Sequence, residues 1–136
     1  MNFREFMEKP SYTAVVLFDK DRANLLSRFP APVGWRSIAH HMTINMGAAK
    51  WPNQLGQKVT LKVIALGQNE RVMAVKVETP VASTNQTKHI TIAVNTSIGA
   101  KPVESNFIQQ WNSIEPFELQ GWITEVAGNG TTLQSS

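Results

Sequence analysis

Apolar and polar residues alternate along several short stretches of the chain, as they do in strands with one buried face. The segment YTAVVLF (12–18) is rich in β-branched and aromatic residues and lies between Pro10 and a charged DKD. Two alternating segments flank the turn sequence GQNE and predict a β-hairpin. The predicted strands are 12–18, 37–47, 58–67, 71–78, 88–95 and 117–127, with Gly121 as a candidate bulge in the last.

Two segments are predicted to form helices. Leu25, Leu26 and Phe29 recur at helical intervals after an acidic first turn, which predicts a helix over 19–29. A shorter helix is predicted around 104–111, capped by Ser105 and Asn106. The strand-rich order predicts an α+β fold with mostly antiparallel pairing. We expect one domain over 1–127 and a flexible polar tail, GNGTTLQSS, over 128–136.

Two of the predicted strands, AHHMTIN (39–45) and KHITIAVN (88–95), are near copies of each other. Successive residues of a strand point to opposite faces, so each copy has an apolar face and a polar face. The polar faces carry His, Thr and Asn in the same order: His41, Thr43 and Asn45 in the first copy, and His89, Thr91 and Asn95 in the second. His40, by contrast, falls on the apolar face of the first copy.

This pair of patterns suits phosphoryl chemistry. Two imidazoles that titrate near neutrality can act as general base and general acid, and two threonine hydroxyls can donate hydrogen bonds to phosphate oxygens. Zinc is the alternative, although a catalytic zinc site normally needs a third protein ligand and the chain has no cysteine. A single His–x–Thr is common by chance because Thr favours strands; the matched repetition is what indicates a function.

Composition limits the partners and the cellular compartment that we expect for this protein. The net charge of +3 comes from dispersed basic residues, which fits a solvated surface or a site for a small anion rather than a duplex-DNA-binding stripe. The absence of cysteine excludes disulfides and a thiolate nucleophile and is compatible with a reducing compartment. No apolar run has the length of a membrane span or of a signal peptide, so we expect a soluble, cytoplasmic protein without a membrane partner.

HMTI (41–44) and HITI (89–92) resemble the paired His–x–Thr–hydrophobic signatures of the two-histidine (2H) phosphoesterase superfamily. That group includes RNA 2′,3′-cyclic phosphodiesterases and the phosphodiesterase domain of fungal tRNA ligases. The resemblance covers about Tyr12 to Glu125, including AKPVESN after the second motif. It implies a compact two-lobed fold with a central cleft, an acid/base pair in His41 and His89, and phosphate donors in Thr43 and Thr91. It implies no cofactor and no metal.

The compact size and the opening MNFREFMEKPSY resemble phage anti-CBASS nucleases, which degrade the cyclic di- and trinucleotide messengers of bacterial immunity. This resemblance implies a cyclic oligonucleotide substrate and, if the chain is phage-encoded, the host cytoplasm. The alternatives are an RNA 2′,3′-cyclic phosphodiesterase in RNA end processing, a non-catalytic sponge for cyclic nucleotides, and a structural adaptor. The expected partner is thus a small nucleotide or an RNA 3′ end, and the oligomeric state stays open.

Candidate substrate-binding residues are aromatic or charged. Four rings are candidates for stacking on a nucleobase, two lysines flank the second motif and are candidates for a phosphate, and one carboxylate is a candidate for a base edge. They are Tyr12, Trp35, Trp51, Trp122, Lys88, Lys101 and Glu125.

Overall fold

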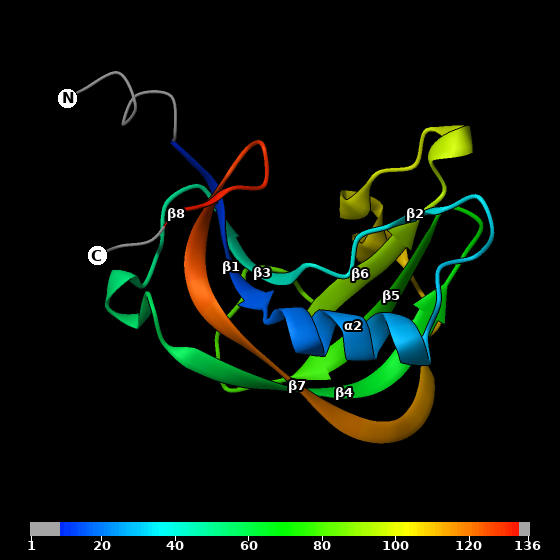
Figure 1. Ribbon diagram of the computed structural model, residues 1–136, viewed down its shortest axis with the longest axis horizontal. Helices are drawn as coiled ribbons and strands as arrows, with labels where there is room; N and C mark the ends of the chain where they lie inside the picture. Colours follow the sequence, from blue (N-terminus) through cyan, green and yellow to red (C-terminus); the bar gives the residue numbers. More distant parts are fainter. Residues whose placement is uncertain (1–8, 134–136) are drawn as a thin grey trace.

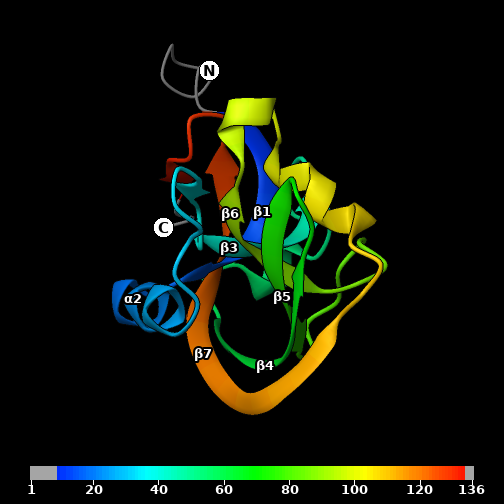
Figure 2. The same cartoon turned by 90° about the vertical axis from the view of Figure 1, so that its right-hand side faces the viewer.

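The computed structural model describes residues 9–133, and within them a single antiparallel sheet closes into a barrel (Figures 1 and 2). Around the barrel the strands follow the order β1, β3, β6, β5, β4, β7, and β7 pairs again with β1. Their bounds are β1 Pro10–Leu17, β3 His41–Met46, β4 Lys58–Gln68, β5 Val72–Glu78, β6 His89–Val94 and β7 Asn112–Ala127. Two short strands add to it: β2 (Arg36–Ser37) pairs with β6, and β8 (Thr132–Leu133) with β7.

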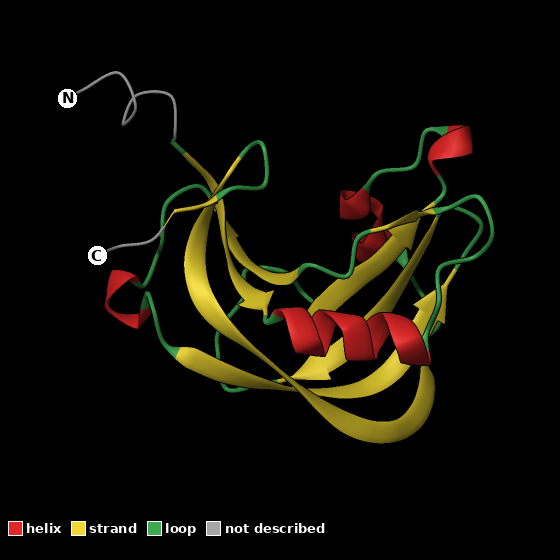
Figure 3. Cartoon of the chain, in the orientation of Figure 1, coloured by secondary structure: helices red, strands yellow, loops and turns green. Residues whose placement is uncertain are grey.

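The two-lobed α+β fold expected from the sequence is therefore wrong. The described chain is mostly β, with one α-helix, α2 (Asp19–Arg28), and the 3-10 turns η1 (Pro52–Gln54), η2 (Thr96–Ile98) and η3 (Pro102–Phe107) (Figure 3). The buried faces of all six barrel strands converge on one core, which includes Val15, Ile44, Val75, Ile90 and Ile123. The hairpin between the two motifs completes this barrel instead of building a second lobe.

Much of the predicted secondary structure is present. The hairpin forms as β4 and β5, and the 19–29 helix forms as α2, which buries Leu25 in the core. β7 begins at Asn112, before the predicted start, and tolerates Pro116 because its pairing with β4 shifts register beside that proline. Long strands can therefore run through a proline where the ladder is already irregular.

Gly121 has a role other than the predicted bulge. Its register is continuous, with Leu17 on one side and Val59 on the other. A Cβ atom at this position would lie 2.3 Å from the carbonyl oxygen of Val16. Gly121 thus allows β7 to approach β1 closely where the barrel closes.

The predicted 37–47 strand is interrupted. Ala39 is buried and adopts a positive φ of 43°, and this turn separates β2 from β3. His40, expected on the apolar face, is consequently half-buried beside the strand instead of joining the core. Its carbonyl oxygen accepts a hydrogen bond from the N–H of Leu17 in β1.

The predicted 104–111 helix is instead the 3-10 turn η3, and Ser105 and Asn106 lie inside it rather than at its start. The carboxylate of Glu104 accepts a hydrogen bond from the backbone N–H of Lys101. At the C-terminal end, part of the expected tail pairs in β8, where Leu133 O accepts a hydrogen bond from Thr124 Oγ1. Residues 1–8 and 134–136, which include most of the MNFREFMEKPSY segment, lie outside the described residues.

Candidate active site

The two His–x–Thr strands are neighbours in the barrel. β3 and β6 pair antiparallel with Met42 opposite Ile90, and both of these side chains are fully buried in the core. Because the strands run in opposite directions around this pair, His41 lies toward Thr91, and Thr43 toward His89. The two motifs are thus related by a local two-fold through Met42 and Ile90, with their polar side chains on the face opposite the core.

A cavity of about 230 Å³ lies over this face, which we call the two-histidine pocket. It brings together all four side chains that the sequence predicted to act together. Its lining consists of Tyr12, Ile38, His41, Thr43, Met46, Asn85, His89, Thr91, Pro102, Val103 and Asn106.

His41 lies between two other rings. Its Nδ1 is 2.9 Å from Nδ1 of His40, so one of these two nitrogens donates a hydrogen bond to the other, and its face stacks on Tyr12 with ring centroids 4.7 Å apart. Burial, followed by the nearby His40 and His89, lowers the pKa of His41 to about 3. The ring is therefore neutral at neutral pH.

His89 has a different partner. Its Nδ1 is 2.8 Å from the carbonyl oxygen of Thr87, which can only accept a hydrogen bond. Nδ1 therefore carries the proton, and in the neutral ring Nε2 keeps a lone pair. Burial lowers the pKa of His89, and the bond to Thr87 partly opposes that shift.

The two threonines also differ. Thr91 is buried, and its Oγ1 is 2.8 Å from Oγ of the buried Ser105 and 3.3 Å from the carbonyl oxygen of Pro102. Thr43 is partly exposed, and its backbone carbonyl accepts a hydrogen bond from Ser83 Oγ. In residues 9–133 no protein atom bonds the hydroxyl of Thr43.

Two segments fold over the strands and complete the pocket wall. The loop before β6 is fastened to β3 because Ser83 and Thr84 donate hydrogen bonds to the carbonyls of Thr43 and Ile44. This places Asn85 at the pocket.

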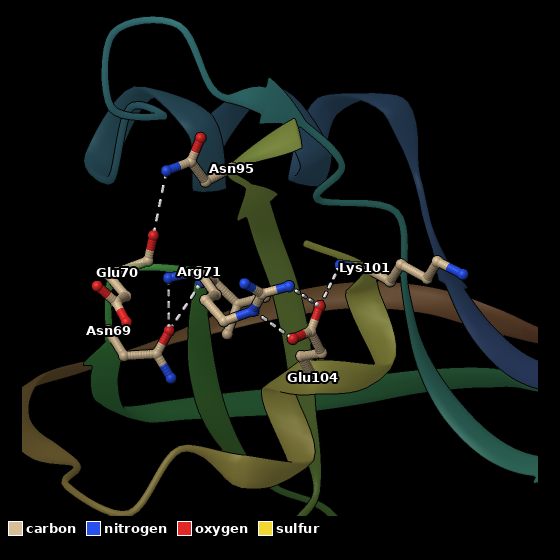
Figure 4. Close-up of polar contacts among 7 residues, drawn as sticks. Asn69, Glu70, Arg71, Asn95, Lys101 and Glu104 are labelled. Carbon is tan, nitrogen blue, oxygen red and sulfur yellow. Dashed lines mark hydrogen bonds and ion pairs between the residues drawn. The ribbon is translucent and has the colours of Figure 1, made fainter. Parts of the chain in front are cut away.

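The turn η3 is held by a separate set of polar contacts. Glu104 forms an ion pair with Arg71, which immediately precedes β5, and accepts a hydrogen bond from the N–H of Lys101 (Figure 4). Asn69 Oδ1 accepts hydrogen bonds from the N–H groups of Arg71 and Val72, so the backbone that carries Arg71 is itself held in place. The network positions Pro102, Val103 and Asn106 of η3 along the pocket.

Of the candidate substrate-binding residues, Tyr12 lies at the pocket and the others do not. Trp35 and Trp51 pack against the main core, and Trp122 packs against a smaller cluster on β1 and β7 that includes Ala14, Val16 and Val126. All three rings are partly buried by packing in the closed barrel.

The charged candidates also lie elsewhere. Lys88 Nζ donates to the carbonyl of Thr79 and lines a separate depression. Glu125 accepts the N–H of Ala49 and thereby holds the 47–50 turn. Lys101 is the N-cap of η3 and is exposed, and it is not among the residues that line the pocket.

The third residue of the repeated pattern is structural in both copies. Asn45 bridges the turn after β3 through bonds to the carbonyls of Met46 and Ala48 and to the N–H of Lys50. Asn95 bonds the carbonyl of Glu70 and accepts from Ser97. The repeated Asn thus caps the ends of β3 and β6 instead of facing the pocket.

Sequence patterns missed several pocket residues. Ile38 and Met46 reach the pocket because backbone irregularities at Ala39 and in the β1–β3 register change the side to which they point. Asn85 lies on a loop without periodicity, and Asn106 was interpreted as a cap. The AKPVESN segment after the second motif was the one signal that pointed to η3.

Within 9–133, no group of three His, Cys, Asp or Glu side chains is placed to hold a metal ion. The same part of the chain contains no helix long and apolar enough to cross a membrane.

Comparison with known proteins identifies the family. The family model described as the fungal tRNA ligase phosphodiesterase domain matches residues 10–132, which is nearly the whole chain. No curated protein matches the chain. The family model spans both His–x–Thr strands and the η3 segment that encloses them. The chain therefore belongs to the fungal tRNA ligase phosphodiesterase domain family of the 2H superfamily, and is a phosphodiesterase with a nucleotide or RNA substrate.

Proposed function

We propose that this protein hydrolyses the 2′,3′-cyclic phosphate at an RNA 3′ end, with His41 and His89 as the acid/base pair and Thr43 and Thr91 as phosphate donors. The observation that carries the proposal is the convergence of both imidazoles and both threonines on one pocket of about 230 Å³. The matching family of phosphodiesterase domains supports the reaction class.

The proposed roles of the two histidines follow from their Nδ1 partners. His89 donates its Nδ1 proton to a carbonyl, so its Nε2 lone pair is available to take a proton from an attacking water. The oxygen of that water then bonds to phosphorus. His41 donates its Nε2 proton to the ribose oxygen that departs. The products are one phosphomonoester and one ribose hydroxyl.

His41 must be protonated to act as the acid, although burial and its two histidine neighbours lower its pKa to about 3. A bound phosphate carries negative charge, which favours the protonated ring and opposes the effects of burial and of the two neighbouring histidines. His40 Nδ1 can then accept a hydrogen bond from the Nδ1–H group of His41, and this bond holds the His41 ring in place. Substrate binding thus supplies the charge that the acid needs.

The mouth of the pocket fits the rest of a nucleotide. Met46 of β3 and Val103 of η3 both line the pocket and remain 74% and 62% exposed. Exposed apolar side chains at a pocket rim mark a contact surface for an apolar partner, and the face of a nucleobase is such a partner.

Cleavage of 3′–5′ linkages in cyclic oligonucleotides is the second candidate. In that reaction a ribose 2′-OH attacks phosphorus, and the 5′ oxygen departs with a proton from the acid. The observation that favours it is a larger cavity beside the pocket, of about 510 Å³, with room for more than one phosphate.

One experiment separates the candidates. The purified protein is incubated in EDTA with an oligoribonucleotide that ends in a 2′,3′-cyclic phosphate and, separately, with cyclic di- and trinucleotides. We expect the cyclic end to open to a phosphomonoester. Opening only of the cyclic oligonucleotides would replace the first candidate with the second. Tight binding without turnover would indicate a sponge, and loss of turnover in EDTA would contradict the metal-independent mechanism.

A further inference from the structure

A groove that joins the two-histidine pocket has the chemistry of an anion site. It has a volume of about 510 Å³ and shares Tyr12, Ile38, His41 and Pro102 with the pocket. Its remaining walls are Arg22, Arg36, Ser37, His40, Gly128, Asn129 and Gly130. We call this space the arginine groove.

The volumes indicate that a nucleotide substrate extends beyond the pocket. Small-molecule sites have volumes of about 300–1,000 Å³, and the two-histidine pocket is smaller than this range. Its size suits a phosphate group, so the rest of a nucleotide substrate must extend out of the pocket. The arginine groove shares four walls with the pocket and is within the usual range.

The charge of the groove is positive. Arg22 of α2 and Arg36 of β2 line it from different elements, and no Asp or Glu is among its lining residues. Arg22 Nε donates to the carbonyl of Ile38, which fastens the side chain across the groove wall. Its terminal amino groups bond no atom of residues 9–133. Planar guanidinium groups match the oxygens of a phosphate, and here two of them face the same space as His40.

We propose that the arginine groove is a second phosphate subsite, which binds the phosphate one nucleotide away from the phosphate held by the two histidines. This inference rests on the proposed function, because it places the remainder of a nucleotide substrate. The second phosphate has two sources: the internal phosphodiester of a linear RNA end, or the second phosphate of a cyclic dinucleotide.

The test measures binding rather than turnover. Wild-type protein is titrated by calorimetry with adenosine 2′-monophosphate, with the dinucleotide ApA carrying a terminal 2′-phosphate, and with cyclic diadenylate. We expect a ligand with two phosphates to bind more tightly than the mononucleotide. In Arg36→Gln that excess affinity should fall about tenfold, and in the Arg22→Gln/Arg36→Gln double variant it should disappear, whereas the mononucleotide should bind as before.

Lys62→Gln is the matched control because it removes one positive charge from a depression that shares no wall with the pocket. It should keep the preference for two phosphates. Arg36 is exposed on a two-residue strand, so its variant tests the subsite without the backbone bond that Arg22 makes.

If the arginine variants lose affinity for the ApA ligand alone, the groove binds linear RNA. If they lose affinity for cyclic diadenylate alone, the groove binds the cyclic dinucleotide. Either result supports the subsite. The proposal would be overturned if the variants lost as much affinity for the mononucleotide as for the two-phosphate ligands. It would also be overturned if Arg36→Gln kept the full preference for two phosphates. Failure of the proposed function has a different signature, since a protein that hydrolyses no 2′,3′-cyclic phosphate can still show this binding preference.

Discussion

The two copies of the His–x–Thr motif have the same pattern but different surroundings. In the β3 copy, His41 contacts an imidazole and a tyrosine ring, and the hydroxyl of Thr43 faces the pocket without a bond to any atom of residues 9–133. In the β6 copy, His89 donates to a backbone carbonyl and Thr91 bonds Ser105. The local two-fold relates the strands but not the groups that pack around them.

This difference shows how a repeated motif can acquire two roles. A carbonyl partner keeps the proton on His89 Nδ1, which prepares Nε2 to accept one. An imidazole partner can accept a proton from His41 or donate one to it, so the charge of that ring responds to what enters the pocket. We therefore expect the copies to respond differently to the same substitution.

The largest effect is expected at the histidines. His41→Ala and His89→Ala should each lower kcat/KM by about 10²–10⁴, because each removes one proton transfer. Substrates with a nitrophenolate leaving group need no acid, so they should restore turnover in His41→Ala but not in His89→Ala. Steady-state kinetics on both substrates measure this difference. Thermal unfolding serves as the folding control, and more than about a tenth of wild-type activity in either variant would refute the assignment.

At the threonines, activity and stability should separate. Thr43→Ala and Thr91→Ala should each reduce kcat by about 10²–10³ through loss of a phosphate donor. Thr91→Ala should also lower the free energy of unfolding by about 1–3 kcal/mol, because the buried hydroxyl of Ser105 loses its partner. Thr43→Ala should leave stability nearly unchanged. Denaturant unfolding together with kcat gives both quantities, and equal stability of the two variants would contradict the comparison.

His40 should have a smaller effect, since it acts through His41. His40→Phe removes the Nδ1 partner and should lower kcat about tenfold with little change in KM. His40→Asn offers an oxygen near the same position and should recover part of the loss. The pH profile of kcat distinguishes this positioning role from a structural one: the limb assigned to His41 should shift in His40→Phe. An unchanged profile would rule the role out.

A separate effect is expected in the dependence of stability on pH. The pKa of His41 is about 3 in the folded chain and near 6.5 when unfolded. As pH falls below about 6.5, the unfolded chain binds a proton that the folded chain does not, so stability declines toward pH 3. His41→Gln should show a shallower decline between pH 6.5 and 4, measured by denaturant unfolding. The lowered pKa values of His40 and His89 act in the same direction and stay in the variant, so some decline should remain.

Local pattern was sufficient for most of the elements and for the facing of the His and Thr side chains of the motifs. Alternation placed Met42 and Ile90 in the core, and this by itself turned His41 and His89 away from it. Helical spacing at Leu25 and the turn between β4 and β5 were equally local. These predictions succeeded because strand and helix periodicity depend on neighbours within a few residues.

Tertiary structure decided the rest. The sequence pattern had no means of predicting that β1 pairs with β7, more than 100 residues away, so the expected two lobes are one closed barrel. The same closure partly buries Trp35 and Trp51, brings Asn85 and Asn106 to the pocket, and gives His41 and His89 different partners. Contacts between distant segments depend on how all the apolar faces fit around one core, and that fit is a property of the assembled fold rather than of any stretch of the chain.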